Sequence, residues 1–183
     1  MDIITNDEVA VSGRVDPTLS FAIDTTTVGF GTITSGALRY ATSDTNGSGS
    51  APGNGDPITL TLSTNADDGA VIELRDQNTN ATSGLYSTDT GTTLASAAST
   101  AVSAGTANFG AYGKNASGLT IAESFDHDST ADVAISTTFQ TLASVAAPVS
   151  NGSLDVSLVS AVAGATPAGA YSDTLTIIAT GKF

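Results

Sequence analysis

The sequence has no cysteine, no tryptophan and only one histidine in 183 residues. The absence of cysteine excludes disulfide bridges and thiolate chemistry. One histidine without any cysteine provides too few ligands for a tetrahedral zinc site. No nucleophile–base pair can be assembled from these residues, because the chain also lacks a glycine-flanked serine elbow. Aromatic residues make up only 5% of the chain, which argues against a surface of stacked rings that binds sugars.

Basic residues are also scarce, with 5 Lys and Arg against 18 Asp and Glu and a net charge of −13. This balance argues against nucleic acid and anionic membranes as partners, and it is compatible with Ca²⁺ and with an extracellular location. No apolar run approaches the roughly 20 residues of a membrane span, so we expect none. The opening Met1–Ile4 stretch lacks a basic start and an apolar core. We therefore expect either a cytoplasmic protein or a mature form.

What the chain does contain is short segments of alternating apolar and polar residues, separated by turn residues. Thr, Val, Ile, Ser and Gly dominate, and these residues favour strands and turns over helix interiors. The pattern predicts an all-β, antiparallel sandwich or barrel in one domain. Asp68-Gly69 predicts a hairpin between two of the segments, and a pairing is also expected between 106–113 and 119–123. The expected strands are 8–15, 17–24, 28–33, 37–41, 58–65, 70–76, 85–86, 106–113, 119–123, 139–145, 154–158 and 171–179.

The segment 8–15 is the one around which the functional hypothesis is built. Val9, Val11, Gly13 and Val15 share one face of an extended chain, and small or polar residues fill the other face. Pro17 then interrupts the pattern, because proline has no amide to give to a sheet. The leading strand can therefore pair within its own molecule or complete the sheet of another one, and the alternation is the same in both cases.

Three parts of the sequence resemble a known family. VAVSGRVD at residues 9–16, followed by LSF at 19–21, is similar to the mature N-terminus of chaperone–usher pilins, in particular those with the spore coat protein U domain. Residues 165–177 (ATPAGAYSDTLTI) resemble the final strands of the same group, and residues 58–65 resemble the middle of such domains. Many of these pilins carry an early cysteine bridge, which this chain lacks.

The resemblance implies an immunoglobulin-like, pilin-like β-sandwich (residues 16–183) preceded by an N-terminal donor strand (residues 1–15). In that family the donor strand of one subunit fills a gap in the sheet of the next. Carried over, Val9, Val11 and Val15 are the inserting side chains, and Gly13 lies where the groove has no room for one. The implied partners are copies of the same chain, and the implied place is an extracellular filament at the cell surface.

Two acidic stretches are candidates for calcium. Asp126, Asp128 and Asp132 surround His127, and three carboxylates in a loop can bind Ca²⁺. A solvated acidic turn is the simpler interpretation. Residues 44–49 (DTNGSG) match the opening of an EF-hand loop. However, the twelfth position of that loop is Gly55, where a bidentate glutamate is needed, so a Gly/Ser-rich turn is the simpler interpretation.

The sequence thus predicts a structural protein, not an enzyme, with no cofactor other than the candidate Ca²⁺. It predicts a filament subunit that polymerises head to tail by strand exchange. The first alternative is a stand-alone surface or adhesion domain, with or without calcium, in which residues 8–15 stay within the molecule. A second alternative is a retaining glycosidase on a jelly roll, which needs a carboxylate pair. The chain has four Asn-x-Ser/Thr sequons (Asn46, Asn80, Asn115 and Asn151), of which two or three are expected by chance in so hydroxyl-rich a chain, so they carry little weight.

Overall fold

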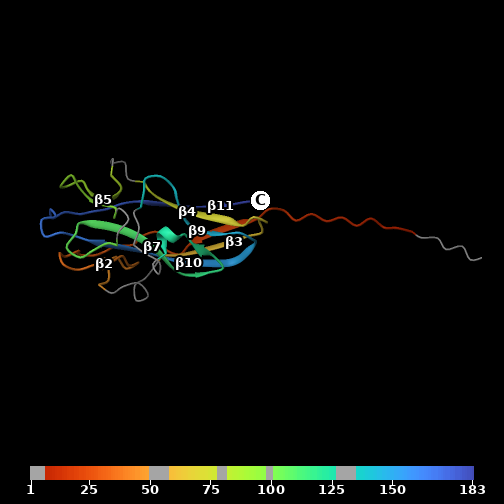
Figure 1. Cartoon of the computed structure of the whole chain (residues 1–183), viewed down its shortest axis with the longest axis horizontal. Coiled ribbons are helices and arrows are strands. Elements are labelled where there is room, and N and C mark those ends of the chain that lie inside the picture. Colours follow the sequence, from red (N-terminus) through yellow and green to blue (C-terminus); the bar gives the residue numbers. More distant parts are fainter. Residues whose placement is uncertain (1–6, 50–57, 78–81, 98–100, 127–134) are drawn as a thin grey trace, which may run out of the picture.

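The structure is a computed structural model, and it describes residues 7–49, 58–77, 82–97, 101–126 and 135–183. The described residues form an all-β protein whose antiparallel sheets are arranged like a sandwich (Figure 1). The only helical element among them is one turn of 3₁₀ helix, η1 (Glu123–Phe125). The strands are β1 (Leu19–Ile23), β2 (Arg39–Tyr40), β3 (Ile58–Thr64), β4 (Ala70–Asp76), β5 (Gly84–Ser87), β6 (Thr92–Ala95), β7 (Asn108–Ser117), β8 (Thr120–Ile121), β9 (Gln140–Val145), β10 (Val149–Ala161) and β11 (Leu175–Gly181).

The first sheet is built around β10, the longest strand. Its first half pairs with β3, its second half pairs with β2, and β7 pairs with most of its length. β3 pairs in turn with β1, so that β1 forms an edge of this sheet. A bulge lies between Val149 and Gly152, where Asn151 has a positive φ of 54°. Bulges of this kind bend a strand and increase its twist.

The second sheet has the order β11-β4-β9-β8, with β11 at one edge. The core lies between the two sheets, and each sheet contributes every second residue of its strands. Leu60 and Leu62 of β3 and Ile72 and Leu74 of β4 are fully buried in it. The alternation that predicted these two strands therefore also identified their buried faces correctly.

A separate hairpin of β5 and β6 adds to the same end of the domain as β2. Leu85 and Leu94 from this hairpin reach the main core. A smaller cluster forms where β2, β7 and β10 meet the loop that precedes β7. Its buried members are Tyr40, Ala97, Val102, Tyr112, Val159 and Ala161.

The predicted hairpin at Asp68-Gly69 is wrong, although both of its strands exist. β3 pairs with β1 and β10, whereas β4 pairs with β11 and β9, so the chain between them crosses from one sheet to the other. The turn still uses the left-handed glycine that the sequence indicates, with φ of 71° at Gly69. Ala66 and Ala70 are both fully buried beside it. Turn chemistry alone does not decide which strands pair. The burial of these two alanines stabilises the chain where it crosses from one sheet to the other.

The expected pairing of 106–113 with 119–123 is also wrong. β7 continues to Ser117 and pairs with β10, and β8 pairs with β9 in the other sheet. Residues 28–33, expected as a strand, form only isolated bridges at Gly29 and Phe30. The described residues contain no helix with the length and hydrophobicity of a membrane span.

Candidate functional site

The tail, defined here as residues 7–16, is extended and projects away from the domain (Figure 1). It forms no strand pairing in the structure, so the expected first strand 8–15 is not part of a sheet in this molecule. Val9, Val11 and Val15 are 84%, 91% and 84% exposed. At Gly13, a methyl group added to the backbone would meet nothing within 4 Å. Three valines left in water on one side of an extended chain are an unpartnered apolar surface.

The root of the tail is fixed to the turn that follows β3. The Asn65 side chain donates to the Asp16 carbonyl oxygen at 2.8 Å and accepts from the Thr18 backbone N–H at 2.7 Å. Arg14 Nε and Asp16 Oδ1 form an ion pair at 2.8 Å just beyond this point. The tail therefore leaves the domain in a defined direction.

The seam, defined here as the side of the sandwich between β1 and β11, is open. Within the described residues β1 pairs only with β3, and β11 pairs only with β4, so each strand has one free backbone edge. The two strands come close to each other across the sandwich. No residue of β11 is fully buried. Its inward residues Leu175, Ile177 and Ala179 are only partly covered, as are Phe21 and Ile23 of β1.

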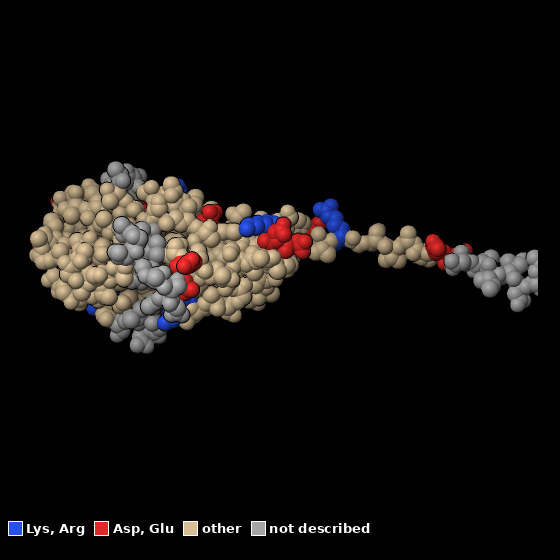
Figure 2. Space-filling view, in the orientation of Figure 1, with Lys and Arg blue, Asp and Glu red and all other residues tan. Residues whose placement is uncertain are grey.

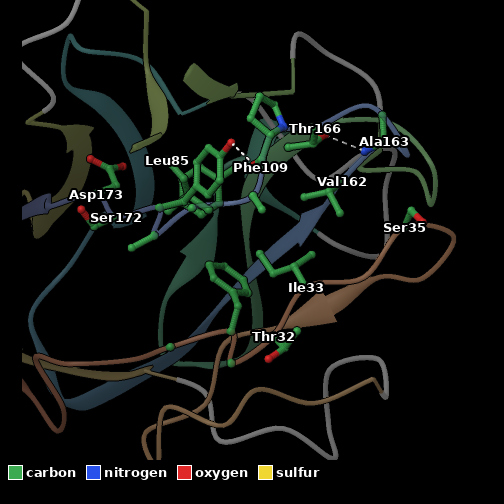
Figure 3. A pocket seen from close by; sticks show the side chains of 18 of the residues that line it. Thr32, Ile33, Ser35, Leu85, Phe109, Val162, Ala163, Thr166, Ser172 and Asp173 are labelled. Carbon is green, nitrogen blue, oxygen red and sulfur yellow. Dashed lines mark hydrogen bonds between the residues drawn. The ribbon is translucent and has the colours of Figure 1, made fainter. Parts of the chain in front are cut away.

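The hollow is a cavity of about 760 Å³ at the far end of the seam from the tail. One wall is the segment 28–35 and the other is the segment 162–173, while buried Leu85, Phe109 and Leu158 line it from the core (Figure 3). Phe30 packs edge-to-face on Phe109, with ring centroids 6.1 Å apart. The hollow is thus lined mainly by apolar side chains and by backbone.

Two hydrogen bonds hold the wall formed by 162–173 in shape. The Tyr171 hydroxyl donates to the Pro167 carbonyl at 2.8 Å, and the Ala163 N–H donates to Thr166 Oγ1 at 3.0 Å (Figure 3). Ser172 and Tyr86 exchange backbone hydrogen bonds, which tie this wall to β5. The wall is therefore attached to the β5–β6 hairpin and to β11, and not to β1.

Asp173 lies in this wall and is close to Asp76 at the end of β4. Burial, hydrogen bonding to Asp76 and the negative charge of Asp76 together raise the pKa of Asp173 to about 8. Asp76 is almost fully buried, and its Oδ2 accepts the Gly84 N–H at 2.7 Å. A carboxyl group that is buried beside another carboxyl group ionises less easily. Asp173 therefore keeps its proton at neutral pH, beside the hollow.

Of the three aspartates in the first calcium candidate, the structure describes only Asp126. Asp126 forms a backbone bridge with Gly113, whereas Asp128, Asp132 and His127 lie outside the described residues. In the other candidate loop, the hydroxyl of Thr42 and the side chain and backbone of Asn46 all bond to Asp44, and they lower its pKa to about 2. That carboxylate is used to close a turn. Among the described residues no group of three or more acidic, histidine or cysteine side chains could hold a metal ion.

Searches against protein-family models, curated proteins and solved structures found no match for this chain. The site must therefore be interpreted from its own geometry. Sequence reasoning identified the tail valines but did not find the hollow. A signal was present, because residues 28–38 and 162–172 contain no charged residue in a chain of net charge −13.

Proposed function

We propose that this chain is a structural subunit of an extracellular filament, joined head to tail by insertion of one copy's tail into the seam of the next. The domain is then an incomplete, immunoglobulin-like sandwich of the pilin type, as the resemblance at its two ends suggests. The observation that carries the proposal is the pairing of a bare valine tail with an open seam in one molecule. Strand addition supplies backbone hydrogen bonds along the free edges and places alternate side chains in the core.

The dimensions of the two parts support this. The residues 9–15 span seven positions, and β11 also has seven residues. An inserted strand of that length can bond along the whole free edge of β11. Each valine that becomes buried stabilises the complex by about 1.5–3 kcal/mol before ordering costs.

The positions of tail and hollow also determine the direction of the inserted strand. β11 begins beside the hollow at Leu175 and ends at Gly181, paired with Ala70 near the root of the tail. A neighbour's tail that enters at the hollow therefore runs antiparallel to β11. A tail folded back onto its own seam has to run parallel to β11. β1 runs in the opposite direction to β11, so a neighbour's tail is antiparallel to the seven-residue β11 and a folded-back tail is antiparallel to the five-residue β1. Antiparallel pairing is slightly more stable per residue, and exchange between molecules uses the longer antiparallel edge.

The proposal is tested by substituting opposite faces of the tail with the same side chain. Gly13→Leu adds bulk on the face that enters the seam, and Ser12→Leu adds the same bulk on the other face. Electron microscopy and light scattering of the purified full-length chain should detect fibres for wild type and Ser12→Leu only. Circular dichroism should show that both variants are folded. Fibres from Gly13→Leu at wild-type yield would contradict insertion.

A stand-alone surface domain that binds a small ligand is the second candidate. It is favoured by the hollow itself, because about 760 Å³ lies in the range of small-molecule sites. Deletion of residues 1–16 distinguishes the two functions. Under strand exchange the shortened chain loses self-association and gains binding of a peptide with the sequence of residues 7–16. Under the stand-alone function the shortened chain remains a monomer like the wild type and ignores the peptide.

A further inference from the structure

The backbone at the root of the tail is held close to the domain and has little freedom to move. The Asn65 side chain holds the backbone on both sides of Pro17, through Asp16 O and Thr18 N. Val15 is therefore one residue away from a fixed point, and one residue spans at most about 3.6 Å. A neighbour that holds Val15 in its hollow must lie directly against the turn formed by residues 65–69. Strand exchange, on which this inference rests, thus requires the two domains to touch.

The end of the domain that contains the hollow suits such a contact. The stretches 28–38 and 162–172 of its two walls have no charged residue, and the charged residues beside them include Asp173 at the end of one wall, Asp89 next to Gly169, and Arg39, which donates to the Phe30 carbonyl. The face seen in Figure 2 has most of its red and blue atoms near the root of the tail and over the middle of the domain, and the opposite end is mostly tan. Two copies with a net charge of −13 repel each other. Contact costs least where one of the two surfaces carries few charges.

The end that bears the tail complements this surface. Its charged residues include Arg14, Asp16, Asp67, Asp68 and Lys182, and its acidic groups face a surface that carries few charges. Apolar groups lie between them, because Leu19 is 41% exposed and Phe183 is 63% exposed. Across the contact the segment 163–170 offers exposed alanines, Pro167 and free backbone groups.

We propose that the tail-bearing end of the domain, around Pro17, Leu19 and the turn 65–69, is a docking surface for the hollow-bearing end of a second copy, which carries few charges. This contact is separate from the inserted strand. It fixes the orientation of one domain on the next, so a filament built from the chain is stiff at its joints.

The experiment uses cross-linking, since the chain has no cysteine of its own. Full-length Asp67→Cys is mixed with full-length Ala168→Cys, and a short bis-maleimide is added. Both positions are exposed. The control replaces Asp67→Cys with Thr141→Cys, which is exposed on β9 away from both ends. A third pair, Val15→Cys with Val162→Cys, reports tail insertion. Thermal melting verifies that each variant folds like the wild type.

The inference predicts a cross-linked dimer for the 67–168 pair and at least tenfold less for the 141–168 pair. A 15–162 product without a 67–168 product overturns the docking surface and leaves strand exchange standing. A 67–168 product without a 15–162 product supports the docking surface and overturns tail insertion. Absence of both products overturns the inference together with the proposed function.

Discussion

The side-chain amide of Asn65 donates a 2.8 Å hydrogen bond to the carbonyl oxygen of Asp16, and it thereby ties the root of the tail to the turn between the two sheets. The same side chain accepts from the Thr18 N–H on the far side of Pro17. Both bonds are exposed to solvent, so their net contribution to the stability of the fold is small. Their greater effect is on direction, because they hold the tail along the long axis of the domain and away from its own seam.

We expect Asn65→Ala to lower the free energy of unfolding by only about 1 kcal/mol, measured by urea denaturation. We expect it to lower fibre yield by a larger factor, because a loosened tail can turn back onto its own seam. Asn65→Asp is the matched control: it keeps the acceptor for Thr18 and loses the donor to Asp16. Equal fibre yield for wild type and Asn65→Ala would show that the direction of the tail is irrelevant to assembly.

The tail valines should affect assembly and not folding. Val11→Ser changes a side chain that is 91% exposed, so the unfolding free energy of the subunit should change by less than about 0.5 kcal/mol. Burial of a valine is worth about 1.5–3 kcal/mol, so subunit affinity should fall roughly tenfold to a hundredfold. Ala10→Ser, on the opposite face, is the control. Analytical ultracentrifugation gives the affinities, and equal losses for both variants would contradict a one-sided insertion.

Asp173 should make the domain less stable as the pH rises. Its pKa is raised to about 8 in the folded state, from about 4 in an unfolded chain. The folded state therefore holds the proton more tightly, and the stability that it contributes is complete below pH 4 and is lost as the pH rises through 8. Asp173→Asn should flatten this part of the profile of melting temperature against pH. A wild-type profile that rises between pH 5 and 8, unchanged in Asp173→Asn, would contradict the raised pKa of Asp173.

Two glycines with similar backbone angles should respond differently to alanine. Gly69 has φ of 71°, and an added methyl carbon would lie 2.0 Å from the Val145 carbonyl oxygen. Gly91 has φ of 67° and nothing within 4 Å of that position. Gly91→Ala should therefore cost only the left-handed strain, about 1–2 kcal/mol. Gly69→Ala should cost clearly more, because the backbone of β9 has to move. Equal melting temperatures for the two variants would mean that the crossing at Gly69 is not tightly packed.

Alternation of residues was enough to predict where most strands lie and which faces are buried. It predicted β3, β4 and β11 closely, since a strand with one buried face imposes a period of two on the sequence. It did not predict partners. Ile58–Thr64 and Ala70–Asp76 were assigned to one hairpin, although they lie in different sheets. Local periodicity is the same in both arrangements, and the choice between them depends on packing that only the whole fold supplies.

Of the proposed site, the sequence indicated the tail and not the hollow. The sequence indicated Val9, Val11, Gly13 and Val15 because they alternate with small or polar residues. The hollow is formed by residues more than a hundred positions apart, such as Phe30 and Tyr171, and neither wall has a regular period. The raised pKa of Asp173 could not be predicted for the same reason, since Asp173 precedes β11 and comes close to Asp76 only because β11 pairs with β4.

Because the tail and the hollow lie at opposite ends of one molecule, a row of joined copies has two chemically different termini. One terminus always offers a vacant seam, and the other always offers a bare strand. Growth and arrest at the two termini are therefore separate events that different molecules can control. A short peptide copied from the tail should block addition at one terminus and leave the other free to elongate.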